Sequence, residues 1–240
     1  MDATLRNRLV WFAEGESALM RALMDASLDL DAPSRLSGWR RRHVVAHLIG
    51  NADALGNLVH WARTGEPRAM YASPGARQEQ IMKDAEKEDV WLISACRDAI
   101  HRLSEAVYTL RGPQWDALVR TAQGREVRAA EIPWLRTRES FIHSFDLNVG
   151  FALEKLHRPL VDALLDDAVA NFNRRREPPA VLLIPSDRER TWSIADDDAD
   201  RYRVEGTAAQ ILSWLIGRPP MRLEARNGYP VNAPPLPTWL

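Results

Sequence analysis

Residues 132–147 read IPWLRTRESFIHSFDL, and this stretch indicates the fold more strongly than any other part of the sequence. At about 100° per residue, Glu139 falls on one helical stripe with the apolar side chains around it. His143 and Asp146 lie close to the same stripe. We therefore predict a helix over residues 129–154 whose core-facing side carries a glutamate, a histidine and an aspartate.

These ionisable side chains need partners, because burying an unpaired charge is costly. Glu139 and His143 are four residues apart, so they point the same way from a helix and can bind one metal ion together. A hydrogen bond or salt bridge inside a helical bundle would also satisfy them. The Glu-x-x-x-His spacing alone does not separate these two interpretations.

A second predicted helix supplies another histidine. Residues 41–62 read RRHVVAHLIGNADALGNLVHWA, and His47 lies at the edge of the apolar stripe of this segment. Together with Glu139 and His143 it would give three inward ligands from two helices, which leaves positions open on a metal ion, as in catalytic sites. His43, four residues before His47, makes an alternative metal-binding pair with it.

Apolar periodicity predicts a series of long helices followed by a shorter mixed segment. The long helices are predicted over residues 2–30, 40–63, 77–110 and 129–154, with an irregular connection over 113–128. The mixed segment is predicted to contain a helix over 159–176, strands over 180–184, 190–195 and 202–205, an acidic turn at 196–198, a helix over 207–216 and a proline-rich tail over 217–240. The predicted fold class is therefore mainly α, with a four-helix bundle over residues 1–155 and a smaller α/β domain over 156–240.

The composition of the 240 residues excludes several classes of protein. Lys and Arg number 32 and Asp and Glu 33, so the net charge of −1 gives no bulk attraction to nucleic acid or to a membrane surface. No apolar run approaches the length of a transmembrane helix, and the N-terminus lacks the apolar core of a signal peptide. We expect a cytoplasmic protein and, by default, a monomer.

The single cysteine, Cys96, cannot form an internal disulfide, which suits a reducing compartment. No histidine adjoins it in the sequence, so we expect it to be buried as a small apolar residue and not to act as a nucleophile.

Three arginines follow loops or a helix end: Arg77, Arg125 and Arg218. A guanidinium group binds a carboxylate through two parallel hydrogen bonds, so each is a candidate for contact with an acidic substrate. A structural or surface role is the alternative for each of them. The sequence contains no glycine-rich phosphate loop, no Gly-x-Ser-x-Gly elbow and no dinucleotide-binding fingerprint.

Several longer motifs follow one another along the chain. They are Gly38-Trp39, His43-Val-Val-Ala-His47, Met70-Tyr71-Ala72-Ser73-Pro74, Thr121-Ala-Gln-Gly-Arg125, Arg138-Glu139-Ser-Phe-Ile-His143 and Gly217-Arg218. With these motifs the sequence resembles the mycothiol-dependent maleylpyruvate isomerase family, whose N-terminal half is a DinB-like metal-binding four-helix bundle. The likeness is dense in the predicted bundle and sparse after it.

The resemblance implies that His47, Glu139 and His143 bind Zn²⁺ and that Arg218 is catalytic. It also implies an activity, the cis–trans isomerisation of maleylpyruvate to fumarylpyruvate in the gentisate pathway of aromatic catabolism. The reaction would proceed by addition and elimination of a low-molecular-weight thiol, which we expect to be mycothiol, with glutathione as the alternative. Because coordination to Zn²⁺ deprotonates a thiol, the metal would activate this cofactor.

Two further residues have hypothetical roles in this site. Arg77 ends the Met70–Ala76 loop and would hold a carboxylate of the small dicarboxylate substrate. Asp146 comes three residues after His143 and would orient that histidine through a hydrogen bond, although a surface position fits its spacing as well.

Two other functions stay open at this level. A zinc-dependent thiol S-transferase of the same superfamily would use the same metal ligands and release a thioether product. A non-catalytic, metal-stabilised module that binds a protein partner would close its zinc with a fourth protein ligand such as His43.

Overall fold

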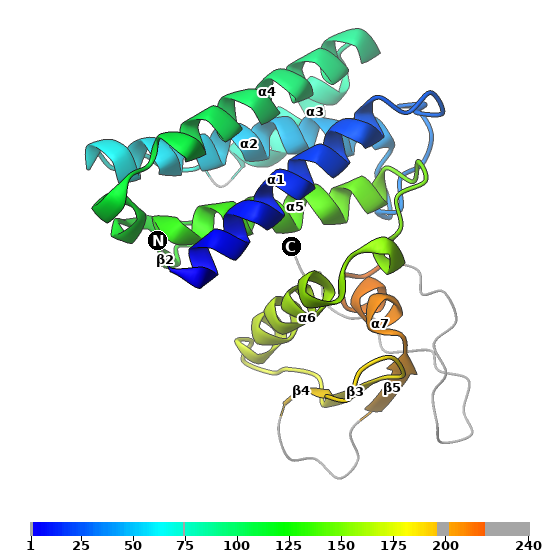
Figure 1. Cartoon of the computed structure of the whole chain (residues 1–240). Helices are drawn as coiled ribbons and strands as arrows, with labels where there is room; N and C mark the ends of the chain where they lie inside the picture. The colour runs from blue at the N-terminus through cyan, green and yellow to red at the C-terminus, as the bar shows by residue number, and fades with distance from the viewer. Residues whose placement is uncertain (1, 74, 196–201, 219–240) are drawn as a thin grey trace. The chain divides into compact units, whose positions relative to one another are not determined.

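The computed structural model of the chain describes residues 2–73, 75–195 and 202–218 (Figure 1). The chain divides into two compact units, Met1–Phe151 and Ala152–Leu240, close to the boundary predicted after residue 155. The predicted acidic turn at 196–198 and the proline-rich tail beyond residue 218 lie outside the described residues.

The first unit is a bundle of long helices, as predicted. Its helices are α1 (Ala3–Leu23), α2 (Arg41–Thr64), α3 (Ala76–Ala85), α4 (Asp89–Thr109) and α5 (Ile132–Asp146). Helices α1, α2, α4 and α5 pack against one another, and α3 lies beside α2 (Figure 1). Fully buried leucine and isoleucine side chains such as Leu19, Leu48, Leu103 and Ile132 fill the core between them. The mainly α fold class is therefore confirmed.

The prediction of one continuous helix over residues 77–110 is wrong, because α3 and α4 are separate helices. Arg42 of α2 reaches the break between them, where its Nη1 donates to the carbonyl oxygens of Ala85 at 2.8 Å and Lys87 at 3.2 Å. Its Nη2 donates to the carboxylate of Asp89 at 2.9 Å. A side chain from another helix thus satisfies backbone groups that a continuous helix would have paired internally.

Two predicted helices also end early. After Leu23 the chain leaves α1, and the Asp25 carboxylate accepts hydrogen bonds from the backbone N–H and the hydroxyl of Ser27 in a local turn. Helix α5 ends at Asp146, and Asn148 then adopts a φ of 54°. A residue in this left-handed conformation commonly follows the end of a helix, which explains why α5 stops before residue 154.

The connection between α4 and α5 contains a small hairpin that the sequence analysis missed. It consists of β1 (Leu118–Arg120) and β2 (Glu126–Arg128), which pair antiparallel. Val119 pairs with Val127, and both side chains are buried. At the turn, the Thr121 N–H donates to the Arg125 carbonyl at 2.9 Å, and Gly124 supplies the φ of 79° that a tight turn requires. The hairpin contacts α2.

The second unit has an α/β structure, as predicted. It contains α6 (Arg158–Asn173), β3 (Val181–Pro185), β4 (Trp192–Ile194), β5 (Tyr202–Gly206) and α7 (Ala208–Leu215). The strands form one sheet in the order β4-β3-β5, in which β3 is antiparallel to β4 and parallel to β5. Leu183 in the central strand pairs with Trp192 on one side and Val204 on the other, and all three are buried.

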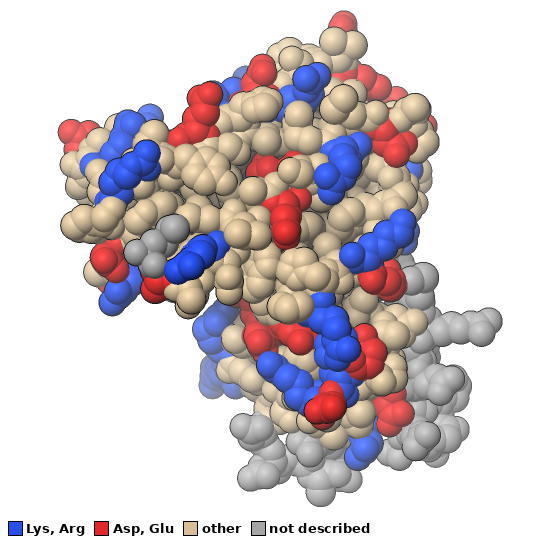
Figure 2. Space-filling view, viewed as in Figure 1, with Lys and Arg blue, Asp and Glu red and all other residues tan. Residues whose placement is uncertain are grey.

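Among the described residues, no helix combines the length and apolar character that spanning a membrane would need. On the face shown in Figure 2, basic and acidic side chains are interspersed over the helices of the first unit. This mixture agrees with the net charge of −1.

Candidate functional site

Three ionisable side chains meet where α2 and α5 pack together in the first unit. His47 comes from α2, and Glu139 and His143 come from successive turns of α5. Oε2 of Glu139 lies 2.9 Å from Nε2 of His47 and 3.3 Å from Nε2 of His143. All three side chains are buried. The structure therefore brings together the three residues that the sequence singled out as metal ligands.

The chemistry of this donor set fits one zinc ion. Each residue offers one ligand atom, and these atoms all lie within 4.8 Å of one another. Two ligands at about 2.0–2.1 Å from a tetrahedral Zn²⁺ lie roughly 3.3 Å apart, close to the two distances from Glu139 Oε2. Two imidazoles and a carboxylate also form one of the protein ligand sets that leave a coordination position open in catalytic zinc sites.

The protonation equilibria of the three groups are shifted in different directions. Burial lowers the pKa of His47 to about 4, against the opposing effect of its Glu139 partner, so this imidazole is neutral near pH 7. Burial alone would raise the pKa of Glu139, but hydrogen bonds from His143 and His47 hold it well below its usual value. A neutral histidine and an ionised carboxylate are the forms that coordinate a metal.

Asp146 fixes the orientation of His143. Its Oδ2 lies 2.8 Å from Nδ1 of His143, and the carboxylate is completely buried. Burial works against protonation of His143, but the hydrogen bonds to Asp146 and Glu139 raise its pKa above the usual value. With Nδ1–H donated to Asp146, Nε2 of His143 faces Glu139, and once deprotonated it would offer its lone pair to a metal, as in the usual arrangement of a metal-binding histidine.

Other candidates from the sequence have structural partners. His43 accepts a hydrogen bond at Nδ1 from the backbone N–H of Arg40 at 3.1 Å, so it caps α2, and it is not a member of the group formed by His47, Glu139 and His143. Cys96 is buried, as predicted, and burial raises the pKa of its thiol to about 12. Arg125 forms an ion pair with Glu131, with 3.2 Å between Nη1 and Oε2.

Arg77, at the start of α3, is next to the metal-binding group. Its Nη2 lies 3.3 Å from Nδ1 of His47. Both residues line a cavity of about 270 Å³ between α2, α3 and the loop before α3, and Tyr71 lies in its wall. Burial raises the pKa of the Tyr71 hydroxyl, against the effect of the Arg77 guanidinium, so the phenol stays protonated. We name this space the inner cavity. A ligand in it would contact both His47 and the positively charged guanidinium of Arg77.

Arg218 belongs to the second unit, directly after α7. Its side chain is buried, its Nη1 donates to the carbonyl oxygen of Ile216, and its backbone N–H donates to the carbonyl of Ser213 at 2.9 Å. Its role stays a prediction.

The sequence analysis missed a buried ionic network beside the site. Arg136 of α5 is 0% exposed, and its Nε donates to Oε1 of Glu16 in α1 at 2.7 Å. Its Nη1 donates to Oδ1 of Asn51 at 2.8 Å and to the carbonyl of Leu48 at 3.2 Å, both in α2. Ser140 donates a further hydrogen bond to Glu16 at 2.6 Å. The network therefore ties three helices together.

One sequence signal pointed to this network. Glu16 lies four residues after Phe12 and three before Leu19, on the apolar stripe of α1, and all three are buried. A charged residue in such a stripe needs a buried partner of opposite charge.

Comparison with known proteins gives two family matches and two close structural matches. The model of the mycothiol maleylpyruvate isomerase N-terminal domain matches residues 12–148, and the model of the C-terminal domain named with it matches residues 155–228. The crystal structure of a mycothiol-dependent maleylpyruvate isomerase is 30% identical, covers 100% of both chains and superposes with a TM-score of 0.91. A histidine-to-alanine mutant of such an isomerase is 29% identical, with the same coverage and a TM-score of 0.91. No curated protein sequence matches the chain.

Proposed function

This chain belongs to the mycothiol maleylpyruvate isomerase family, and from that premise we propose that it isomerises maleylpyruvate to fumarylpyruvate with zinc and mycothiol. The observation that carries the proposal is the convergence of His47, Glu139 and His143 beside an arginine-lined cavity. The place of the reaction in aromatic ring cleavage, the cytoplasmic location and the monomeric state stay predictions of the sequence analysis.

The chemistry of the reaction explains why a metal and a thiol are needed. A thiolate that adds to the cis double bond turns it into a single bond, which rotates before elimination restores the double bond in the trans form. A free thiol has a pKa of about 8.5 and is mostly protonated at pH 7. When bound, zinc supplies the positive charge that keeps such a thiol ionised.

The side chains of the protein hold and orient the reacting groups. His47, Glu139 and His143 are the metal ligands, and the hydrogen bond that His143 donates to Asp146 keeps the His143 ring in a fixed orientation. Arg77, whose Nη2 lies 3.3 Å from Nδ1 of His47, holds a substrate carboxylate in the inner cavity.

The second unit contributes Arg218 to this reaction scheme. Its guanidinium stabilises the negative charge that develops on the substrate during addition. This assignment rests on the match between the Gly217-Arg218 motif and the family.

The first experiment is an absorbance assay of maleylpyruvate isomerisation with zinc-loaded protein, without thiol and with mycothiol, glutathione or cysteine in catalytic amounts. We expect turnover with mycothiol and none without a thiol. A thioether that accumulates in amounts equal to the thiol consumed would contradict the isomerase and identify an S-transferase. Zinc-loaded protein that neither turns over nor takes up any of these thiols would identify a non-catalytic module.

The roles of the two arginines predict different kinetic effects. Arg77→Ala removes charge-assisted hydrogen bonds to the bound substrate, so the KM for maleylpyruvate is expected to rise by about 10-fold or more. Arg218→Ala removes stabilisation of the developing charge, so kcat is expected to fall by about 100-fold. Both variants keep their zinc, measured by metal analysis. Unchanged kinetics in either variant would refute the role assigned to that arginine.

A further inference from the structure

A second, larger cavity adjoins the inner one in the first unit. It has a volume of about 690 Å³ and lies between the end of α2, the loop before α3 and the β1–β2 hairpin. The two cavities share a wall that includes Met70, Tyr71 and Arg77. We name the larger space the outer cavity. Its volume lies within the range of about 300–1,000 Å³ typical of small-molecule sites.

One residue that lines the outer cavity, Thr121, has a buried hydroxyl without a partner in the described part of the chain. Thr121 is 8% exposed, and its Oγ1 has no hydrogen-bond partner among the residues that the structure describes. The Thr121 backbone is held in the hairpin turn by its N–H bond to the Arg125 carbonyl, so the position of this residue beside the cavity is fixed. Because buried polar atoms are nearly always hydrogen-bonded, this hydroxyl is an indication that a ligand supplies the missing partner.

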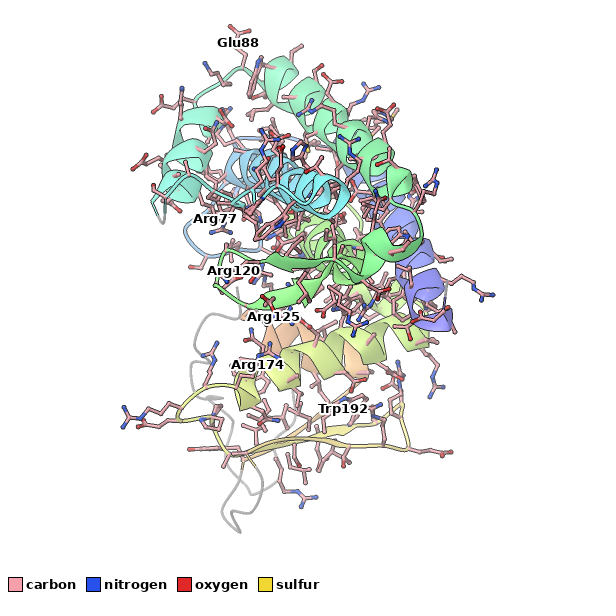
Figure 3. All side chains as sticks on the ribbon, turned by 90° about the vertical axis from the view of Figure 1, so that its left-hand side faces the viewer. Arg77, Glu88, Arg120, Arg125, Arg174 and Trp192 are labelled. Carbon is pink, nitrogen blue, oxygen red and sulfur yellow. The ribbon has the colours of Figure 1, made fainter. Side chains whose placement is uncertain are left out.

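Two arginines in the wall of the outer cavity are also without ionic partners. Neither Arg68 nor Arg120 forms an ion pair with another residue in the described part of the chain. Figure 3 shows Arg120 on the same side of the unit as Arg77, with Arg120 on the hairpin and Arg77 at the start of α3. Arginine carries only hydrogen-bond donors. The cavity therefore favours a ligand rich in acceptor oxygens, and the ring of Trp61 adds a flat apolar surface.

These observations extend the proposed function, on which the following inference rests. We propose that the outer cavity binds the oxygen-rich, non-reacting body of the thiol cofactor, with Arg120 and Thr121 as its main contacts. The inner cavity, which His47 lines, then receives the cofactor sulfur together with the small dicarboxylate. The division follows from size, because the inner cavity is less than half as large as the outer one.

The proposal is tested with S-methylmycothiol, in which the sulfur is blocked so that binding reports mainly on the body of the molecule. Calorimetric titration of the zinc-loaded protein is expected to show that Arg120→Gln raises the Kd about 10-fold, equivalent to about 1.4 kcal/mol. Thr121→Val, which removes only the hydroxyl, is expected to raise it about fivefold. Arg128→Gln is the matched control, because Arg128 lies on the same hairpin outside the cavity and pairs with Asp116.

Steady-state kinetics provide a second readout. In Arg120→Gln the KM for mycothiol is expected to rise about 10-fold while the KM for maleylpyruvate, the constant that Arg77→Ala is expected to raise, stays unchanged. N-acetylcysteine, which lacks the sugar-containing body, is expected to have the same KM with wild type and Arg120→Gln.

Two results would overturn the assignment of the outer cavity. One is equal affinity of S-methylmycothiol for wild type, Arg120→Gln and Thr121→Val; the other is a rise in the KM for maleylpyruvate instead of that for mycothiol. These failures differ from failure of the proposed function. If no thiol supports isomerisation but S-methylmycothiol binds in an Arg120-dependent way, the cavity assignment holds and the isomerase proposal fails.

Discussion

Replacing Glu139 with glutamine is expected to lower the zinc affinity of the protein by at least about 100-fold, because even a residue that only orients a metal ligand contributes 10–100-fold. Oε2 of Glu139 lies between the Nε2 atoms of His47 and His143, so the carboxylate is the one negative charge of the triad. A neutral amide has nearly the same shape but cannot offset the charge of a divalent cation in a buried site. Isomerase activity is expected to fall with the zinc content.

Zinc affinity in this experiment is measured by competition with a coloured chelator, and occupancy by metal analysis. Cobalt substitution gives an independent signal, since its visible absorption depends on the number and type of ligands. Asp146→Asn is a milder comparison variant, because it keeps all three ligands and weakens only the hydrogen bond that orients His143. Its zinc affinity is expected to fall by about 10–100-fold. Wild-type zinc affinity in Glu139→Gln would show that Glu139 is not a metal ligand and would contradict zinc binding by this triad.

The second large effect is expected from Arg136→Met, which should lower the free energy of unfolding by about 3–5 kcal/mol. Methionine fills a similar volume, but Glu16 is then left as a buried carboxylate without its cation. The hydrogen bonds from Arg136 to Asn51 and to the Leu48 carbonyl are lost as well. Breaking one side of a buried ion pair costs more than removing both partners.

Urea unfolding at a fixed zinc concentration measures this effect, since a bound ligand adds to the apparent stability. Arg102→Gln is the matched control: Arg102 pairs with Asp53 at 2.9 Å, both side chains are more than half exposed, and the expected change is below about 1 kcal/mol. Adding Glu16→Leu to Arg136→Met should recover part of the loss, because no buried charge then remains unpaired. A stability of Arg136→Met within about 1 kcal/mol of wild type would mean that the network contributes little.

The position of the network gives it a second consequence for the site. Arg136 lies one turn before Glu139 on α5 and bonds to the carbonyl of Leu48, the residue after His47 on α2. The same guanidinium therefore connects the two helices that carry the metal ligands. Its partner Glu16 extends this connection to α1, so one side chain links three helices of the bundle by hydrogen bonds.

Much of the protein could be predicted from periodicity within single segments. Helix α2, the strands of the second unit and helix α7 lie close to their predicted positions, because burial along one element repeats with the period of that element. Glu139 and His143 are four residues apart on one helix, so their common direction follows from helix geometry alone. Placing His47 with them required only one further assumption, that the apolar stripes of both helices, which carry these ionisable residues, face the same core.

Contacts between distant segments could not be predicted in the same way. Arg42 separates α3 from α4 by bonding to their ends from α2, and Arg136 meets Glu16 across 120 residues of chain. The hairpin strands are too short to show a period, yet their turn places Thr121 at the outer cavity. Periodicity reports which side of an element is buried, whereas partners and cavities depend on how the elements pack, and packing brings together residues that no spacing along the chain relates.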